Sequence, residues 1–173
     1  MTKPNWLPEA LQYSDFNGEW DVFLATVYQI FERDFKKCSP KYQGYPVTYD
    51  SKIDDGKEAA FWHITCRENH KTGNREMDLR RCKRIPWPRP MIEYSTDTAI
   101  SVWKNERKQP RKPRQTSVLI WLEELDYLVI LRERPRVMVL VTAYCTDIES
   151  LKEKLRKERD AYYKMQKPPE RAT

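Results

Sequence analysis

The chain has 173 residues, of which 39% are hydrophobic and 34% charged, and this length suits one domain rather than two. Aromatic residues make up 12% of the chain, enough to build a core, which excludes wholesale disorder. No apolar run approaches the ~18 to 20 residues of a membrane span, and the N-terminus lacks a signal-peptide pattern, so we expect a cytoplasmic protein with no membrane partner. The net charge of +6 agrees equally with a polyanionic partner and with surfaces solvated by mixed charge.

The first predicted element is a core helix of about five turns over residues 20–35, preceded by Asn17 and Gly18 as a start signal. Its apolar residues recur at spacings of three and four, as one face of a helix requires. They are Trp20, Phe23, Leu24, Val27, Ile30, Phe31 and Phe35. We expect residues 1–60 to form a helical N-terminal part, with one short strand at residues 47–49 and a turn at Asp54-Asp55-Gly56.

An apolar segment over residues 59–66 surrounds His63 and must be at least half buried. The stretch from Arg67 to Arg89 that follows holds much of the positive excess of the chain. Its basic residues are Arg67, Lys71, Arg75, Arg80, Arg81, Lys83, Arg84 and Arg89. Only Glu68, Glu76 and Asp78 oppose them.

Four short apolar or β-branched runs then predict strands at residues 100–103, 118–122, 127–131 and 137–142. Two of the connections are too short for a helix, so the strands should pair as an antiparallel meander. The basic, proline-containing segment 108–114 should be an exposed loop, serving either solubility or a grip on RNA. The predicted fold class is α+β, with N-terminal helices and a C-terminal helix packed on an antiparallel sheet of about four strands.

The C-terminal helix is predicted over residues 148–166. Thr146 and Glu149 have the spacing of a capping box, which would start the helix. Its narrow apolar stripe consists of Ile148, Leu151, Leu155 and Tyr162. Pro168 and Pro169 end it, and residues 167–173 should fray.

The four cysteines lie far apart and form no Cys-x-x-Cys pair, so neither a redox motif nor a zinc ribbon is present. His63, Cys66, His70 and Cys82 could converge on zinc, but their spacing matches no standard finger. The alternative is that both cysteines are simply buried. We therefore expect no metal site and no cofactor.

The side chains that remain suit metal-free attack on RNA. RNA carries its own nucleophile, the 2′-OH, so a catalyst must only move two protons and stabilise charge on the phosphorane. A histidine can serve as base or acid, arginine can hold the phosphorane, and Thr or Tyr hydroxyls can hold phosphate oxygens. Residues of these types are His63, Arg80, Arg81, Thr142 and Tyr144. The structural alternatives are a satisfied core histidine and arginines paired with Asp78 or Glu76.

Three runs carry a family resemblance. They are residues 61–65 (FWHIT), residues 78–81 (DLRR) leading to 85–87 (IPW), and residues 127–131 (YLVIL) followed by 140–144 (LVTAY). Together they resemble the phage-associated branch of the barnase, EndoU, colicin and RelE-like nuclease superfamily. The resemblance covers residues 61–147, which would form a nuclease-like core, and leaves the first sixty residues unmatched.

The resemblance implies ribonuclease chemistry with 2′,3′-cyclic phosphate and 5′-OH products. His63 would be general base or acid, Arg81 would stabilise the phosphorane, and Thr142 and Tyr144 would hold the phosphate. Arg80, Arg84 and Trp87 are expected to bind substrate. If residues 80 and 81 lay on a strand they would face opposite ways, so only one could reach the phosphate, and Arg81 is our choice.

The function predicted from the sequence is therefore a metal-independent endoribonuclease, acting as a toxin of a mobile element or toxin–antitoxin system. Its partners would be RNA and an antitoxin or immunity protein. A rival prediction is a non-catalytic nucleic-acid-binding module that uses the Arg67 to Arg89 stretch, with Trp87 and Trp103 as stacking surfaces. A third is a protein that binds another protein through exposed aromatic residues.

Overall fold

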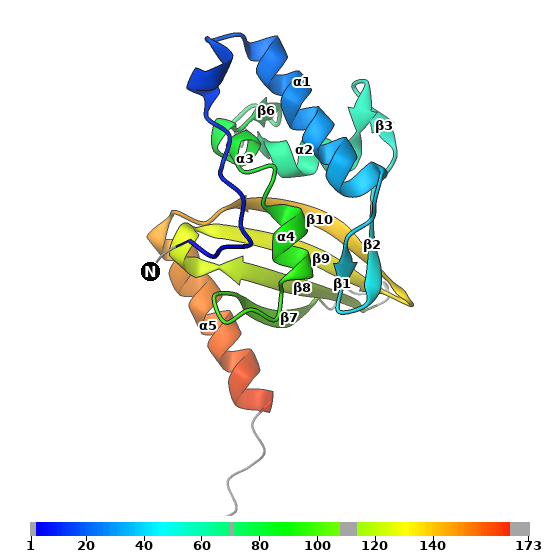
Figure 1. Ribbon diagram of the computed structural model, residues 1–173. Helices are drawn as coiled ribbons and strands as arrows, with labels where there is room; N and C mark the ends of the chain where they lie inside the picture. Colours follow the sequence, from blue (N-terminus) through cyan, green and yellow to red (C-terminus); the bar gives the residue numbers. More distant parts are fainter. Residues whose placement is uncertain (1–2, 70, 108–113, 167–173) are drawn as a thin grey trace, which may run out of the picture.

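The computed structural model describes residues 3–69, 71–107 and 114–166. It is a mixed α/β structure in which helices cover a curled, mainly antiparallel sheet (Figure 1). The helical elements are η1 (Tyr13–Phe16), α1 (Trp20–Phe31), η2 (Glu32–Lys36), α2 (Ala59–Thr65), α3 (Leu79–Lys83), α4 (Pro88–Glu93), η3 (Glu123–Leu125) and α5 (Glu149–Gln166). The strands are β1 (Lys41–Tyr42), β2 (Tyr45–Tyr49), β3 (Ile53–Asp54), β4 (Lys57–Glu58), β5 (Cys66–Glu68), β6 (Arg75–Met77), β7 (Ser101–Arg107), β8 (Gln115–Leu122), β9 (Tyr127–Arg134) and β10 (Val137–Cys145).

The first predicted helix is present, with one change near its end. Residues 20–31 are α-helical and bury Phe23, Val27 and Phe31, as the apolar spacing predicts. The last turn, η2, is a π-helix that widens the helix by one residue and still buries Phe35. Asn17 and Gly18 take left-handed conformations just before the helix, so the predicted start signal is a turn into α1.

The four predicted strands form the antiparallel meander β7, β8, β9 and β10. The sheet nevertheless has six strands in the order β1-β2-β10-β9-β8-β7, rather than about four. The prediction missed that β2 pairs in parallel with residues 138–140 of β10 and that β1 extends the sheet beyond it. Pairing between segments ninety residues apart leaves no local pattern in the sequence.

The N-terminal part is not helical throughout, which corrects the expectation for residues 1–60. Residues 41–58 contain two hairpins, and β2 belongs to the main sheet. The predicted turn at Asp54-Asp55-Gly56 joins β3 to β4, and both Asp55 and Gly56 have positive φ. Such a turn favours Asp followed by Gly, because these residues tolerate the left-handed region best.

The two faces of the sheet carry separate apolar clusters. One face packs against the N-terminal helices through side chains such as Val118, Ile120 and Val129. On the other face, Trp103, Trp121 and Leu128 pack against Leu155 of α5. Successive side chains along a strand point to opposite faces of the sheet, and helices cover both faces, so side chains on both faces are buried.

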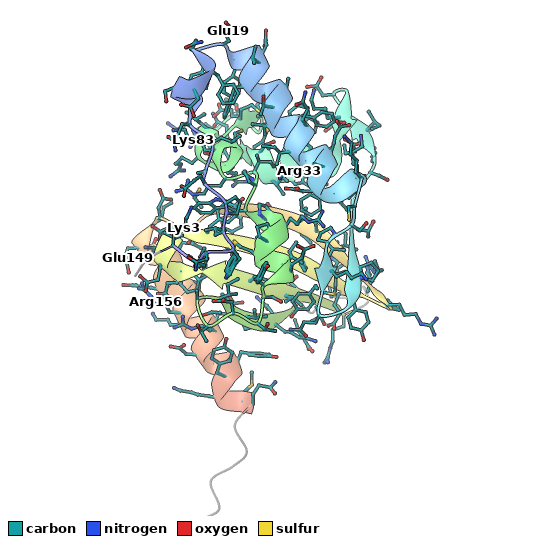
Figure 2. All side chains as sticks on the ribbon, in the orientation of Figure 1. Lys3, Glu19, Arg33, Lys83, Glu149 and Arg156 are labelled. Carbon is teal, nitrogen blue, oxygen red and sulfur yellow. The ribbon has the colours of Figure 1, made fainter. Side chains whose placement is uncertain are left out.

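The start of α5 differs from the predicted capping box. The helix begins at Glu149, and the Thr146 hydroxyl accepts a hydrogen bond from Trp121 Nε1 at 3.0 Å instead. Arg156 reaches Glu149 at 2.7 Å and Glu123 at 2.5 Å, which ties the helix to the β8–β9 connection; Figure 2 labels Glu149 and Arg156.

The predicted frayed tail, residues 167–173, and most of the predicted basic loop, residues 108–113, lie outside the described residues. None of the helices in the described part of the chain has the length and apolar character needed to cross a membrane.

Candidate functional site

The site forms where β2 leaves β10. The parallel pairing covers only Met138, Val139 and Leu140 of β10, and a register shift lies between Leu140 and Thr142. Bulges of this kind often lie next to active sites because they re-aim side chains. Beyond the bulge, α2 and α3 pack beside β10, and in Figure 1 β6 lies next to these two helices. Residues from distant parts of the chain therefore meet at one strand edge.

Helix α2 presents His63 to solvent. Its neighbours Phe61, Trp62, Ile64 and Thr65 are buried, which fixes the helix against the core and leaves His63 exposed. The imidazole makes no hydrogen bond or ion pair with the described residues. The alternative of a satisfied core histidine is therefore wrong.

Arg81 and Thr142 meet at the main-chain carbonyl of His63. Thr142 Oγ1 donates to this oxygen at 2.7 Å, and Arg81 Nη1 donates to it at 3.4 Å and also to the carbonyl of Cys66. Arg81 Nε is buried and has no hydrogen-bond partner among the described residues. Arg81 therefore has N–H groups left to donate to a ligand, in addition to those of Nη1, which bond the two carbonyls.

These three residues line one open pocket of about 490 Å³, which we call the His63 pocket. Its lining residues are Trp62, His63, Cys66, Arg67, Glu68, Gly73, Arg75, Arg81, Val141 and Thr142. Three arginines face a single carboxylate, Glu68, in this lining. Such a surface attracts an anion, and guanidinium groups suit phosphate in particular.

Three charged residues of the pocket were not among the predicted site residues: Arg67, Glu68 and Arg75. The Arg75 guanidinium lies 4.6 Å from the centre of the Trp62 ring, and its Nη1 is 2.5 Å from Asp54 Oδ2. All three come from the β5–β6 hairpin. The basic character of residues 67–89 was visible in the sequence, but the hairpin that brings these three to His63 was not.

A second hollow adjoins the pocket along Arg67, Glu68 and Arg81, and we call it the Tyr144 groove. Its lining residues are Arg67, Glu68, Asn69, Lys71, Glu76, Asp78, Arg80, Arg81, Tyr144, Cys145, Asp147, Ile148 and Leu151. Four cations face four carboxylates here. Tyr144 is half-buried, with the Arg81 guanidinium 5.4 Å from the centre of its ring. Tyr144 lines only the groove, but its ring contacts Arg81, which lines the His63 pocket as well.

Arg80 and Arg81 lie on helix α3, so the supposition that they lie on a strand is wrong. The Asp78 side chain caps this helix by accepting from the backbone N–H groups of both arginines. Asp78 Oδ2 also lies 3.5 Å from Arg80 Nη2 and 3.8 Å from Arg81 Nε, so both arginines form the ion pair with Asp78 that was the structural alternative to phosphate binding. Arg80 bonds Asp147 as well and lines the Tyr144 groove, so only Arg81 reaches the His63 pocket.

Arg84 and Trp87 do not line either hollow, which corrects their expected place in substrate binding. Trp87 is only 5% exposed and donates through Nε1 to the carbonyl of Pro8 at 3.1 Å. The Arg84 guanidinium lies 5.0 Å from the centre of the Trp87 ring and donates to the carbonyl of Arg80. Trp103, the other proposed stacking surface, is 1% exposed. Both tryptophans are core residues.

The cysteines of the zinc hypothesis are buried, as its alternative predicted. Cys82 lies against the carbonyl of Thr65, and burial raises the pKa of its thiol to about 12. Burial also raises the pKa of Cys66. His70 lies outside the described residues, and within those residues no group of three or more His, Cys, Asp or Glu side chains is placed to hold a metal ion.

Comparison of the chain with protein-family models, with curated proteins and with solved structures gave no match.

Proposed function

We propose that the protein is a metal-independent endoribonuclease that cleaves RNA through attack of the substrate's own 2′-OH. The observation that supports this most is the His63 pocket, where an exposed imidazole, an arginine and a threonine hydroxyl lie together. These groups come from α2, α3 and β10, and two of them bond to the backbone of the third. Together they supply the proton carrier and the phosphate-binding groups that this chemistry needs.

The reaction needs two proton transfers, one from the 2′-OH and one to the leaving 5′ oxygen. His63 carries out one of them in this proposal, as base or acid. Glu68 is the carboxylate that lines the pocket and is the residue available for the other. The exposure of both side chains lets them reach a bound RNA strand.

Charge builds up on the phosphorane as the 2′ oxygen attacks, and Arg81 is placed to stabilise it. Its position is fixed by the carbonyls of His63 and Cys66, so little reorganisation is needed at the moment of reaction. Thr142 and Tyr144 orient the phosphate in this scheme. Thr142 does so by turning its single O–H donor from the His63 carbonyl to a phosphate oxygen, and Tyr144 acts through its contact with Arg81.

The product ends test this chemistry. Purified protein is incubated with RNA in EDTA, and the ends of the fragments are identified. We expect 2′,3′-cyclic phosphate and 5′-OH ends. Fragments with 5′-phosphate ends, or binding without cleavage, would contradict the proposal, and the second result would favour the nucleic-acid-binding module.

The resemblance of residues 61–147 to nuclease toxins supports a further part of the proposal, a toxin that acts on RNA in the cytoplasm and has an antitoxin or immunity protein as its partner. Induced expression of the wild-type chain should then arrest growth, and expression of the His63→Ala variant should not. Arrest of equal strength by both chains would contradict this part.

A further inference from the structure

A third hollow lies at the opposite end of β10 from Thr142, and we call it the Arg136 patch. It measures about 380 Å³ and is lined by Tyr45, Arg114, Thr116, Glu133, Arg134, Pro135, Arg136 and Met138. In Figure 1 the tip of the β9–β10 hairpin lies on the side of β1 and β2, away from α3. Arg136 and Thr142 are six residues apart in the chain, which corresponds to roughly 20 Å along a strand. The patch is therefore distinct from the His63 pocket.

The patch carries an unbalanced positive charge. Three arginines line it together with one carboxylate, Glu133, and that carboxylate already pairs with Lys104 at 3.0 Å. Arg114 pairs with Glu106 at 3.1 Å. Arg134 and Arg136 are exposed and form no ion pair or hydrogen bond with the described residues. Two guanidinium groups are thus free to bind phosphates without breaking contacts of the fold.

Arg136 has a backbone conformation that favours glycine. Val137 pairs with Arg134, so Pro135 and Arg136 form a two-residue turn, and Arg136 has a φ of 61°. Proline followed by a residue of positive φ is the type II pattern, in which glycine is the usual second residue. An arginine in the left-handed region costs roughly 1 kcal/mol relative to glycine. The exposed side chain forms no ion pair or hydrogen bond with the described residues that would offset this cost.

Tyr45 supplies an aromatic surface at the same place. Its side chain is 53% exposed at the start of β2, beside the β9–β10 tip. Stacking of a base on an exposed aromatic ring is worth ~1–3 kcal/mol and tolerates any sequence. An exposed ring among arginines is the combination that binds single-stranded nucleic acid, whereas the two tryptophans first considered for stacking are buried.

We propose that the Arg136 patch is a second RNA-binding site, which holds a single-stranded segment of the substrate at a distance from the cleaved bond. Arg134 and Arg136 bind phosphates, and Tyr45 stacks on a base. The identity of the ligand as RNA rests on the proposed function, while the site itself rests on the charge, exposure and backbone conformation of these residues.

The test uses RNA with 2′-O-methyl groups, which cannot be cleaved by 2′-OH attack, and measures binding by fluorescence anisotropy. A trimer is too short to span from the His63 pocket to the patch, whereas a dodecamer is long enough. We expect the double variant Arg134→Gln/Arg136→Gly to bind the dodecamer roughly tenfold more weakly, because two charge-assisted hydrogen-bonding groups are removed. Its affinity for the trimer should change less, because a trimer bound in the His63 pocket does not reach the patch.

Salt dependence gives a second measure. For a single strand, removing one arginine that binds a phosphate should reduce the slope of log K against log salt concentration by about 0.7. The double variant removes two such arginines, so its slope with the dodecamer should decrease by about 1.4. Because glycine suits the backbone at position 136, the single variant Arg136→Gly should weaken binding without lowering the melting temperature.

The matched control is Lys157→Gln on the exposed face of α5, which removes one positive charge far along the chain from the patch. It should leave both the affinity and the salt slope unchanged. The proposal would be overturned if the double variant bound the dodecamer as wild type does, or if Lys157→Gln weakened binding as much as Arg136→Gly. If the wild-type chain bound in the expected way but did not cut unmodified RNA, the patch would stand and the nuclease proposal would fail.

Discussion

The His63 pocket and the Tyr144 groove share three residues but differ in charge. The pocket sets three arginines against one carboxylate, whereas the groove sets four cations against four carboxylates. Ion pairs such as Arg80 with Asp147 and Arg67 with Glu76 neutralise the groove internally. A stretch of basic sequence is therefore not a basic surface throughout. The arginines of the pocket also form ion pairs, such as Arg75 with Asp54, but their partner carboxylates do not line the pocket.

Removal of the imidazole is the strongest way to test the pocket. We expect His63→Ala to reduce RNA cleavage by about 10² to 10⁴-fold, the usual range for loss of a general acid or base. The melting temperature should not change, because the imidazole is exposed and the substitution keeps the carbonyl that Arg81 and Thr142 contact. His70→Ala, which removes the other histidine of the chain, is the control and should remain active. Full cleavage by His63→Ala would disprove the site.

The next test compares a carboxylate of the pocket with a carboxylate that lines only the groove. Glu68→Gln should lower kcat by about 10²-fold and remove one limb of the pH–rate profile, because it removes a proton carrier. Its control is Glu76→Gln, which changes a carboxylate that lines only the groove. If the two variants lost activity equally, the distinction between the hollows would have no catalytic meaning.

Core and surface aromatic residues should differ in how much they contribute to stability. Trp87→Ala should reduce the free energy of unfolding by about 3–5 kcal/mol, as for other large buried aromatic residues. Tyr45→Ala should change it by less than about 0.5 kcal/mol, because its ring is exposed. Denaturant titration measures both. A small effect of Trp87→Ala would contradict its assignment to the core.

Substitution of an arginine in each hollow should give a smaller difference, seen in the KM for RNA. Arg81→Gln should raise KM for RNA by about tenfold, since it removes a phosphate-binding group of the pocket whose one ion pair, with Asp78, is long at 3.8 Å. Arg80→Gln should change KM less than about twofold, because its charge is already neutralised by Asp78 and Asp147. Steady-state kinetics distinguish the two, and a larger effect for Arg80→Gln would reverse the comparison.

The smallest effect near neutral pH concerns the core beneath the pocket. Burial raises the pKa of Cys82 from 9.0 to about 12, so the folded state favours the neutral thiol. Its contribution to stability is complete below pH 9 and declines as pH rises towards 12, by at most about 1.4 kcal/mol per pH unit. Unfolding measured between about pH 8 and 11 should show a steeper decline for wild type than for Cys82→Ala. Equal slopes would contradict the burial of this thiol.

The fold was predictable where local pattern determines it. Strands β7 to β10 are β-branched or aromatic runs, the last three of them joined by short polar turns, and they were placed correctly. The sequence of α2 surrounds His63 with apolar residues on both sides and is only seven residues long, so its helical form could not be recognised. The β5–β6 hairpin is built from charged residues and had no strand signal.

For the site, the residue types and the resemblance led to His63, Arg81 and Thr142, which the structure brings together. Arg67, Glu68 and Arg75 were missed as site residues because their positions depend on the unpredicted hairpin. Trp87 was misplaced for the opposite reason: its basic neighbours suggested a surface, but its packing against Tyr127 buries it. Burial of a large side chain depends on distant partners that a local reading cannot supply.

The central claim is that the substrate's own 2′-OH is the nucleophile, and one measurement tests it directly. Wild-type protein is given matched RNA oligonucleotides in EDTA, one unmodified and one with 2′-O-methyl groups at every position. The account predicts that both bind and that only the unmodified RNA is cut. Cleavage of the methylated RNA at a comparable rate would contradict it.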